Sequence, residues 1–120
     1  MVLEQKKKHF EKLLKRNISH IIHNRTKDPR IGFTTITRII LSDDLHNAKV
    51  FISVLGSKEE QHKTMDGLSS ATNFIRSELA FGLKKYRFTP HISFHYDKDL
   101  EKVHQLMEQF YKLNKEKEAD

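Results

Sequence analysis

The chain has 120 residues and a formal net charge of +6, which suits one small domain with an anionic partner. It contains no cysteine, which excludes a disulfide scaffold and thiolate zinc sites and is typical of a reducing compartment. Hydrophobic residues make up only 37% of the chain, and no apolar run approaches the roughly 18 residues of a membrane-spanning helix. We therefore expect a soluble cytoplasmic protein with a thin core and no membrane anchor or signal peptide.

The positive charge is concentrated in two segments. Residues 1–27 hold eight lysines and arginines against two glutamates, and residues 74–96 hold four against one. Residues 28–73 and 97–120 are each slightly acidic. The two basic segments predict contact with a polyanion, with nucleic acid ahead of an acidic membrane surface.

Residues 3–25 are predicted to form an amphipathic helix, because hydrophobic residues recur at helical spacing. The apolar stripe consists of Leu3, Phe10, Leu14, Ile18, Ile21 and Ile22. The opposite side carries cations that include Lys8, Lys12, Lys15 and Arg16. We expect the apolar side to pack on a sheet and the basic side to face solvent or a phosphate backbone.

Two strands are predicted next, over residues 34–41 and 48–55. The first is rich in β-branched residues, and the second alternates apolar and other residues with a period of two. Asp28, Pro29 and Gly32 mark a turn before the first strand. The connection over residues 42–47 is short, which favours an antiparallel hairpin.

Residues 58–84 are predicted to form two helices, about 58–70 and 72–84, separated by a kink. Ser57 and Glu60 form a capping box at the start of this segment. One apolar stripe runs along it, but modest and poor helix formers cluster in its middle. We place the kink at Ser70, Ala71, Thr72 and Asn73.

A third strand over residues 91–96 and a last helix complete the chain, and Asp97 or Asp99 can cap that helix. The predicted fold class is α+β, a two-layer sandwich with a three-stranded sheet. The order of elements is that of the type II KH domain, an RNA-binding fold, followed by a C-terminal helix. We expect one domain over residues 1–111 and a polar, disordered tail over residues 112–120.

Four separated segments also occur in an order that is typical of one family. They are DPRIGFTTIT (28–37), SDDLHNAKVFISVLG (42–56), the segment 74–79 and the segment 87–90. Together they resemble the ribosome-binding factor A family of bacterial ribosome-assembly proteins, over roughly residues 5–105. The resemblance implies the same KH type II-like fold.

The ordinary KH domain clamps nucleotides with a GxxG loop between two helices, and the chain has no GxxG. The resemblance implies that an interhelical kink of the form Ala-x-Gly takes its place. The matching residues are Ala71, Thr72 and Asn73, so asparagine stands where the family has glycine. Because asparagine tolerates the left-handed region, the kink can survive. Contacts with the shape and charge of folded RNA are expected instead of a single-strand clamp.

Cations beside the kink and on the first helix are the candidate phosphate ligands. The candidate RNA-binding residues are Arg76, Lys84, Lys85, Arg87, Lys8, Lys12, Lys15, Arg16 and Arg30. The cations after residue 82 could instead only stabilise a helix C-terminus. Arg30 could equally brace its own turn through Asp28.

Neither a metal site nor an active site is predicted. The eight histidines show no HExxH spacing, and a zinc site needs three or four convergent ligands. The aspartates fall at turns and at a helix start, where local structure explains them. The sequence has no Walker loop and no dinucleotide-binding fingerprint, so we expect no enzyme activity, no cofactor and no small-molecule substrate.

The resemblance implies a non-catalytic assembly factor that binds the free small ribosomal subunit and its ribosomal RNA. It implies support of late maturation and processing of that RNA, and a role in growth at low temperature. We expect a monomer. Two alternatives stay open: a protein-interaction adaptor that uses the sheet edge and the terminal helix, and a general KH-like RNA binder without a ribosome-specific role.

Overall fold

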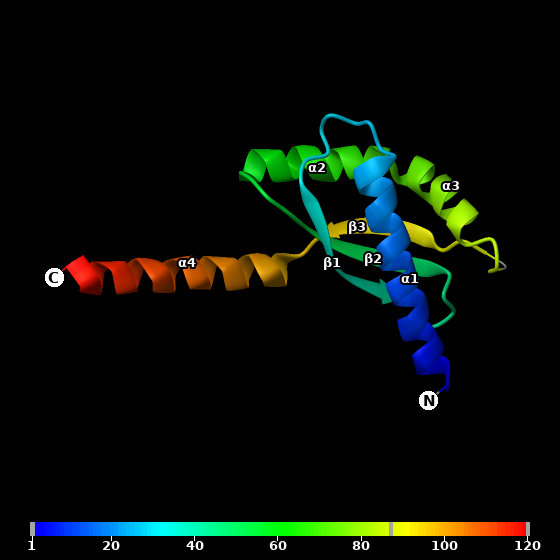
Figure 1. Cartoon of the computed structure of the whole chain (residues 1–120), viewed down its shortest axis with the longest axis horizontal. Coiled ribbons are helices and arrows are strands. Elements are labelled where there is room, and N and C mark those ends of the chain that lie inside the picture. Colours follow the sequence, from blue (N-terminus) through cyan, green and yellow to red (C-terminus); the bar gives the residue numbers. More distant parts are fainter. Residues whose placement is uncertain (1, 87, 120) are drawn as a thin grey trace.

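The computed structural model describes residues 2–86 and 88–119. Within these residues, four helices and three strands follow one another in the order that the sequence analysis predicted (Figure 1). In chain order they are α1 (Val2–Asn24), β1 (Thr34–Leu41), β2 (Asn47–Val54), α2 (Lys58–Ser70), α3 (Thr72–Gly82), β3 (His91–Tyr96) and α4 (Lys98–Ala119). The predicted α+β class and the predicted order of elements are confirmed.

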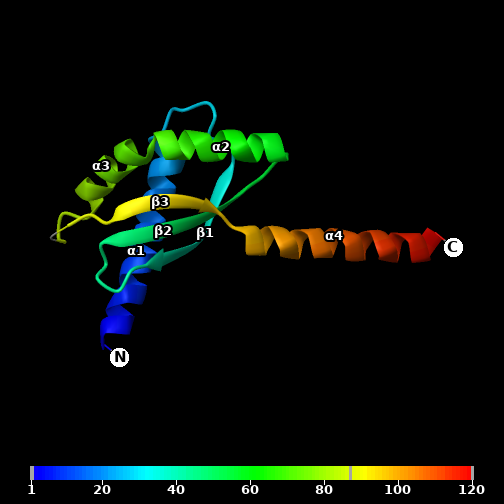
Figure 2. The same cartoon turned by 180° about the vertical axis from the view of Figure 1, so that it is seen from behind.

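The three strands form one sheet in the order β1-β2-β3. β1 and β2 make the predicted antiparallel hairpin, whereas β3 lies parallel to β2 because α2 and α3 carry the chain back across the layer. α1 packs on β1, and α2 and α3 lie along β3. α1 crosses in front of the strands in Figure 1 and behind them in Figure 2, so the sheet has one helix-covered face and one open face.

The core lies between the sheet and the helices. Its fully buried members are Leu14, Ile18, Leu41, Val50, Ile52, Leu68, Ile75, Leu79 and Leu83. Each side chain of this kind contributes about 1.5–3 kcal/mol by leaving water. Leu3 was expected in the same stripe but is 67% exposed.

The turn before β1 is fastened to α2. Thr64, which is fully buried, accepts a hydrogen bond from the Gly32 amide at 3.0 Å and donates one to the Arg30 carbonyl at 3.3 Å. Gly67 lets the two segments approach, because a Cβ there would lie 2.8 Å from the Ile31 side chain. The turn therefore has a fixed position over the sheet.

A β-bulge interrupts the alternation of β1. Ile36 pairs with Ile52, but the next paired residue is Arg38, opposite Phe51, which leaves Thr37 as the extra residue. Thr37 donates a hydrogen bond of 2.5 Å to Asp97, whose other carboxylate oxygen accepts the Leu100 amide at 3.1 Å and so caps α4. After the bulge, Ile39 faces the core and Arg38 lies on the open face.

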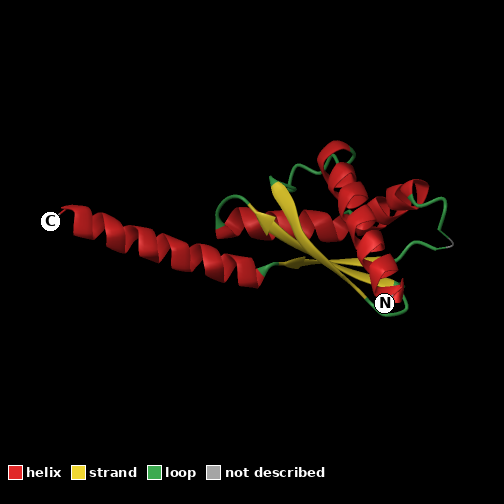
Figure 3. Cartoon of the chain, turned by 60° about the horizontal axis from the view of Figure 1, so that its bottom comes forward, coloured by secondary structure: helices red, strands yellow, loops and turns green. Residues whose placement is uncertain are grey.

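The predicted kink between α2 and α3 is present, and Ala71 makes it. Ala71 has φ −87° and ψ 0°, and its amide bonds to the carbonyls of Gly67 and Ser69. Thr72 continues the turn by donating its hydroxyl to the Leu68 carbonyl at 3.0 Å. α3 then leaves at an angle to α2, which the labelled view of Figure 1 shows, and Figure 3 gives the same helices from another side.

α4 projects away from the sandwich (Figures 1 and 2). Residues 102–115 are all exposed, and six large hydrophobic side chains among them are 52–65% exposed. The helix continues to Ala119, and the expected disordered tail over residues 112–120 stays a prediction. Lysine, glutamate, leucine and alanine dominate there, and all four have high helix propensity. The domain boundary at residue 111 stays a prediction.

Candidate RNA-binding surface

Four exposed cations form a row along α1, which we call the α1 stripe: Lys8, Lys12, Lys15 and Arg16. Their spacing of three and four residues places them on one side of the helix, and Phe10, Leu14 and Ile18 are buried on another. No carboxylate in the part of the chain that the structure describes pairs with these four side chains. The α1 stripe therefore presents four uncompensated charges to solvent.

The α1 stripe does not join the basic segment after α3. Asn17 faces α3, because a Cβ on Gly82 would lie 3.0 Å from its amide oxygen. At about 100° per residue, Lys8, Lys12 and Lys15 lie about 140–200° around α1 from Asn17, and Arg16 lies about 100° from it. The three lysines therefore lie on a different side of α1 from the side that packs against α3.

Arg76 is half-buried and is engaged within the protein. Its guanidinium donates to the Thr89 carbonyl at 3.0 Å and to the Pro90 carbonyl at 3.3 Å, which holds the segment before β3 against α3. A shallow hollow beside these bonds is lined by Asn73, Arg76 and Thr89, among others. Arg76 positions this wall of the hollow whether or not it also meets a phosphate.

Lys84 and Lys85 lie in the turn after α3, and both are exposed. The Lys84 ammonium lies 5.7 Å from the centre of the Phe81 ring, which is itself 64% exposed. Arg87, the fourth predicted cation of this group, lies outside the described residues. This turn thus offers two solvated charges beside an exposed aromatic ring.

Arg30 braces its own turn, which was one of its two predicted roles. Its guanidinium pairs with the Asp28 carboxylate at 2.6–3.2 Å, and its amide donates to the same carboxylate at 2.9 Å. These hydrogen bonds lower the pKa of Asp28 to about 2. Because the charge of Arg30 is already paired, Arg30 has less to offer a phosphate than the α1 stripe has.

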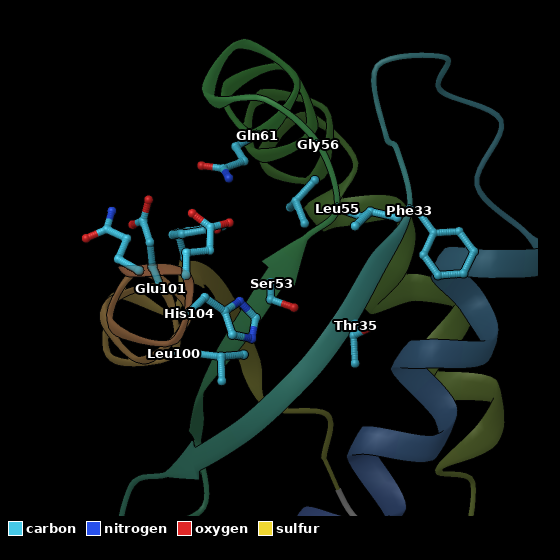
Figure 4. Close-up of a pocket in the computed structure, with 13 residues that line it drawn as sticks. Phe33, Thr35, Ser53, Leu55, Gly56, Gln61, Leu100, Glu101 and His104 are labelled. Carbon is cyan, nitrogen blue, oxygen red and sulfur yellow. The ribbon is translucent and has the colours of Figure 1, made fainter. Parts of the chain in front are cut away.

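A hollow of about 460 Å³ is lined by the start of β1, the end of β2 and the first half of α4. Figure 4 shows Leu100 and His104 of α4 opposite Ser53 and Thr35 of the strands. Its lining mixes apolar and polar side chains. Across residues 2–86 and 88–119, no group of three or more histidines and carboxylates could hold a metal ion.

Sequence analysis gave Arg38 no role and did not connect Phe51 with His95. The structure places these three side chains in one row across the open face of the sheet. The alternation of β2 puts Phe51 on the polar side of its strand, and this is the one signal in the sequence. The bulge that brings Arg38 to the same face has no sequence signature.

Comparisons with known proteins agree on one family. The family model for ribosome-binding factor A matches residues 6–110. The ribosome-binding factor A of Halothermothrix orenii is 43% identical over 116 residues, which cover 97% of this chain and 94% of the relative. The chain belongs to the ribosome-binding factor A family.

Two structures of ribosome-binding factor A from Thermus thermophilus, one crystal structure and one fitted homology model, are similar to this fold. The crystal structure superposes with a TM-score of 0.67 at 26% identity, over 75% of this chain and 93% of that one. The second is a homology model fitted into a cryo-electron microscopy map of a complex with the 30S subunit. It gives a TM-score of 0.60 at 26% identity, over 73% of this chain and 91% of that one. No helix among the described residues is long and apolar enough to cross a membrane.

Asn73 stands at the position where the sequence analysis expected the glycine of an Ala-x-Gly kink. Asn73 does not adopt the left-handed conformation, since Leu45 is the only non-glycine residue with positive φ among the described residues. Asn73 instead lies in the first turn of α3, and the break falls two residues earlier. The kink is therefore kept without glycine.

Proposed function

We propose that this protein is a non-catalytic assembly factor that binds the free small ribosomal subunit in the cytoplasm as a monomer. It supports late maturation of the subunit's ribosomal RNA and growth at low temperature, and it leaves before translation begins. The observation that carries this proposal is membership of the ribosome-binding factor A family over residues 6–110. The Thermus thermophilus relative in its 30S complex supports the choice of subunit.

Electrostatic docking is the proposed mechanism. The α1 stripe offers four uncompensated cations, and Lys84 and Lys85 offer two more on a separate surface. Each cation that neutralises a phosphate releases counterions into solution, which drives binding and makes it dependent on salt. Two separate surfaces can contact two RNA segments at once, so binding favours the arrangement of the subunit in which both segments are in reach.

A second candidate function is a protein-interaction adaptor, and one observation favours it. α4 projects from the domain with large apolar side chains exposed along its length. Isolated exposed hydrophobic residues are ordinary, but several on one helix can dock in a groove of another protein. On this alternative, binding would change little between low and physiological salt.

Co-sedimentation separates the candidates. The protein is mixed with purified small subunits, large subunits or an unrelated structured RNA, and each mixture is centrifuged at 50 and 200 mM salt. The proposal predicts selective recovery with small subunits and weaker binding at high salt. Equal recovery with unrelated RNA indicates a general RNA binder, and recovery that is independent of salt indicates the adaptor.

A further inference from the structure

Three flat, polarisable side chains are direct cross-strand neighbours on the open face of the sheet. Arg38 of β1 lies opposite Phe51 of β2, and Phe51 lies opposite His95 of β3. The Arg38 guanidinium lies over the Phe51 ring, 4.3 Å from its centre, so its outer face is the one left for a further stacked group. The His95 ring centre is 5.4 Å from that of Phe51, with the planes inclined by 32°. The three groups form a continuous row across all three strands.

Contacts at both ends hold this row in place. Arg38 pairs with Asp97 at 3.8 Å and with Asp99 at 3.5 Å. His95 is hydrogen-bonded to the Ser93 hydroxyl at 2.8 Å. Because both ends are fixed, a ligand that stacked on the row would lose little side-chain entropy in ordering it.

The open face also presents one lysine that makes no ion pair among the described residues. Lys49 lies two residues before Phe51 on the same side of β2, about 7 Å away along the strand, and is exposed. The residues of β1, β2 and β3 that alternate onto this face include no carboxylate. The charge of Arg38 is already paired with Asp97 and Asp99, so Lys49 is the cation that this face offers a phosphate.

We propose that Arg38, Phe51 and His95 form a stacking surface for unpaired bases of an RNA strand whose phosphates contact Lys49. Aromatic rings and arginine planes are the groups on which proteins stack unpaired bases, and a flat sheet can present them side by side. The inference rests on the proposed function, since the strand would belong to ribosomal RNA. It adds a site that lies on the opposite face of the sheet from α1.

Tryptophan fluorescence tests the site directly, because the chain contains no tryptophan. A Phe51→Trp variant is titrated with an unstructured twelve-nucleotide adenine-rich RNA. The matched control is Phe110→Trp, which replaces a 63% exposed phenylalanine on α4. Saturable quenching is expected in the Phe51→Trp variant and not in the control. Absence of quenching, or equal quenching in both variants, would overturn the proposal.

Two further variants measure the contribution of stacking to affinity. Phe51→Leu keeps an apolar residue, and Arg38→Lys keeps the charge without the planar group. Each should weaken binding of the oligonucleotide by about fivefold or more and leave its salt dependence unchanged. A cooperative urea-unfolding transition in each variant is the control that the protein is folded. If both variants bind the oligonucleotide with unchanged affinity, the stacking proposal is wrong.

The same proteins distinguish a failure of this site from a failure of the proposed function. If small subunits bind the Phe51→Leu variant and the wild type equally, while alanines in the α1 stripe weaken binding, the stacking site is wrong and the proposed function stands. If the oligonucleotide quenches the Phe51→Trp variant but small subunits bind none of the proteins, the stacking site stands and the proposed function is wrong.

Discussion

Replacement of Asp97 tests whether one carboxylate joins the sheet to α4. Asp97 is 5% exposed, accepts the Thr37 hydroxyl with one oxygen and accepts the Leu100 amide with the other. The Thr37 hydrogen bond, followed by that of Leu100, lowers the pKa of Asp97. The carboxylate therefore holds the bulge of β1 and the first turn of α4 in one place.

The expected loss of stability follows from these two contacts. Loss of a helix N-cap costs about 1 kcal/mol, and loss of a hydrogen bond to a charged acceptor costs about 1.5–3 kcal/mol. Asp97→Ala should therefore lower the free energy of unfolding by about 2.5–4 kcal/mol. At about 4 °C per kcal/mol, the melting temperature should fall by about 10–16 °C. Asp99→Ala is the control, since Asp99 is 79% exposed, and it should cost about 0.5 kcal/mol.

Urea unfolding of Asp97→Ala, Thr37→Val and the double variant measures the coupling. If the reasoning is right, the two changes interact by about 1 kcal/mol or more. Because the pKa is lowered on folding, the ionised carboxylate contributes above its unfolded pKa of about 3.9, and the contribution is lost as pH falls through the folded pKa. The stability gap between wild type and Asp97→Asn should accordingly shrink below about pH 4. An Asp97→Ala loss no larger than that of Asp99→Ala would refute the account.

Three other predictions concern the cations. Subunit affinity should fall between 50 and 200 mM salt, and alanine at the three lysines of the α1 stripe should make that fall about 20–40-fold smaller, because each lost phosphate contact removes about 0.7–0.9 units from the slope of log affinity against log salt. The control is the double variant Lys58→Ala, Lys63→Ala, and an equal effect in the control would contradict the assignment. Arg76→Ala should lower thermal stability by about 1–2 kcal/mol because two carbonyls lose their donor, whereas Lys84→Ala should leave the melting temperature unchanged. Arg30→Ala should leave subunit affinity within about twofold by filter binding, since Asp28 already pairs with Arg30.

Patterns of neighbouring residues, such as helix caps and strand alternation, predicted most of the fold. Ser57 accepts the Glu60 amide at 3.2 Å, as the capping box predicted, and Asp97 caps α4 as one of two candidates. Each observed strand begins within one residue of its predicted start, because alternation and β-branched residues report directly on a half-buried sheet. Patterns of this kind depend on neighbours along the chain, which a single sequence contains.

Features that depend on residues far apart in the sequence could not be predicted from such patterns. The bulge at Thr37 shifts Arg38 to the open face, although its spacing from Ile36 suggests the same side. The bulge depends on Asp97, sixty residues away, which no local pattern connects with Thr37. Similarly, the sequence shows that two segments are basic but does not show that their cations lie on different sides of the domain. That follows from the packing of α1 on α3, which points the lysines of the α1 stripe away from α3.

Most of the described arginines differ from the lysines of the proposed surfaces in what their side chains contact, and Arg16, which lies in the α1 stripe, is the exception. Arg25, Arg30, Arg38 and Arg76 each direct their guanidinium groups at carboxylates, carbonyls or a ring of the protein itself. The lysines of the α1 stripe and of the turn after α3 stay in solvent. Arginine supplies a planar fork that fixes direction, whereas lysine supplies a mobile point charge that follows a phosphate without reading a base. The lysine surfaces should therefore set affinity and salt dependence, and on the stacking proposal the contacts with unpaired bases come from the row of Arg38, Phe51 and His95.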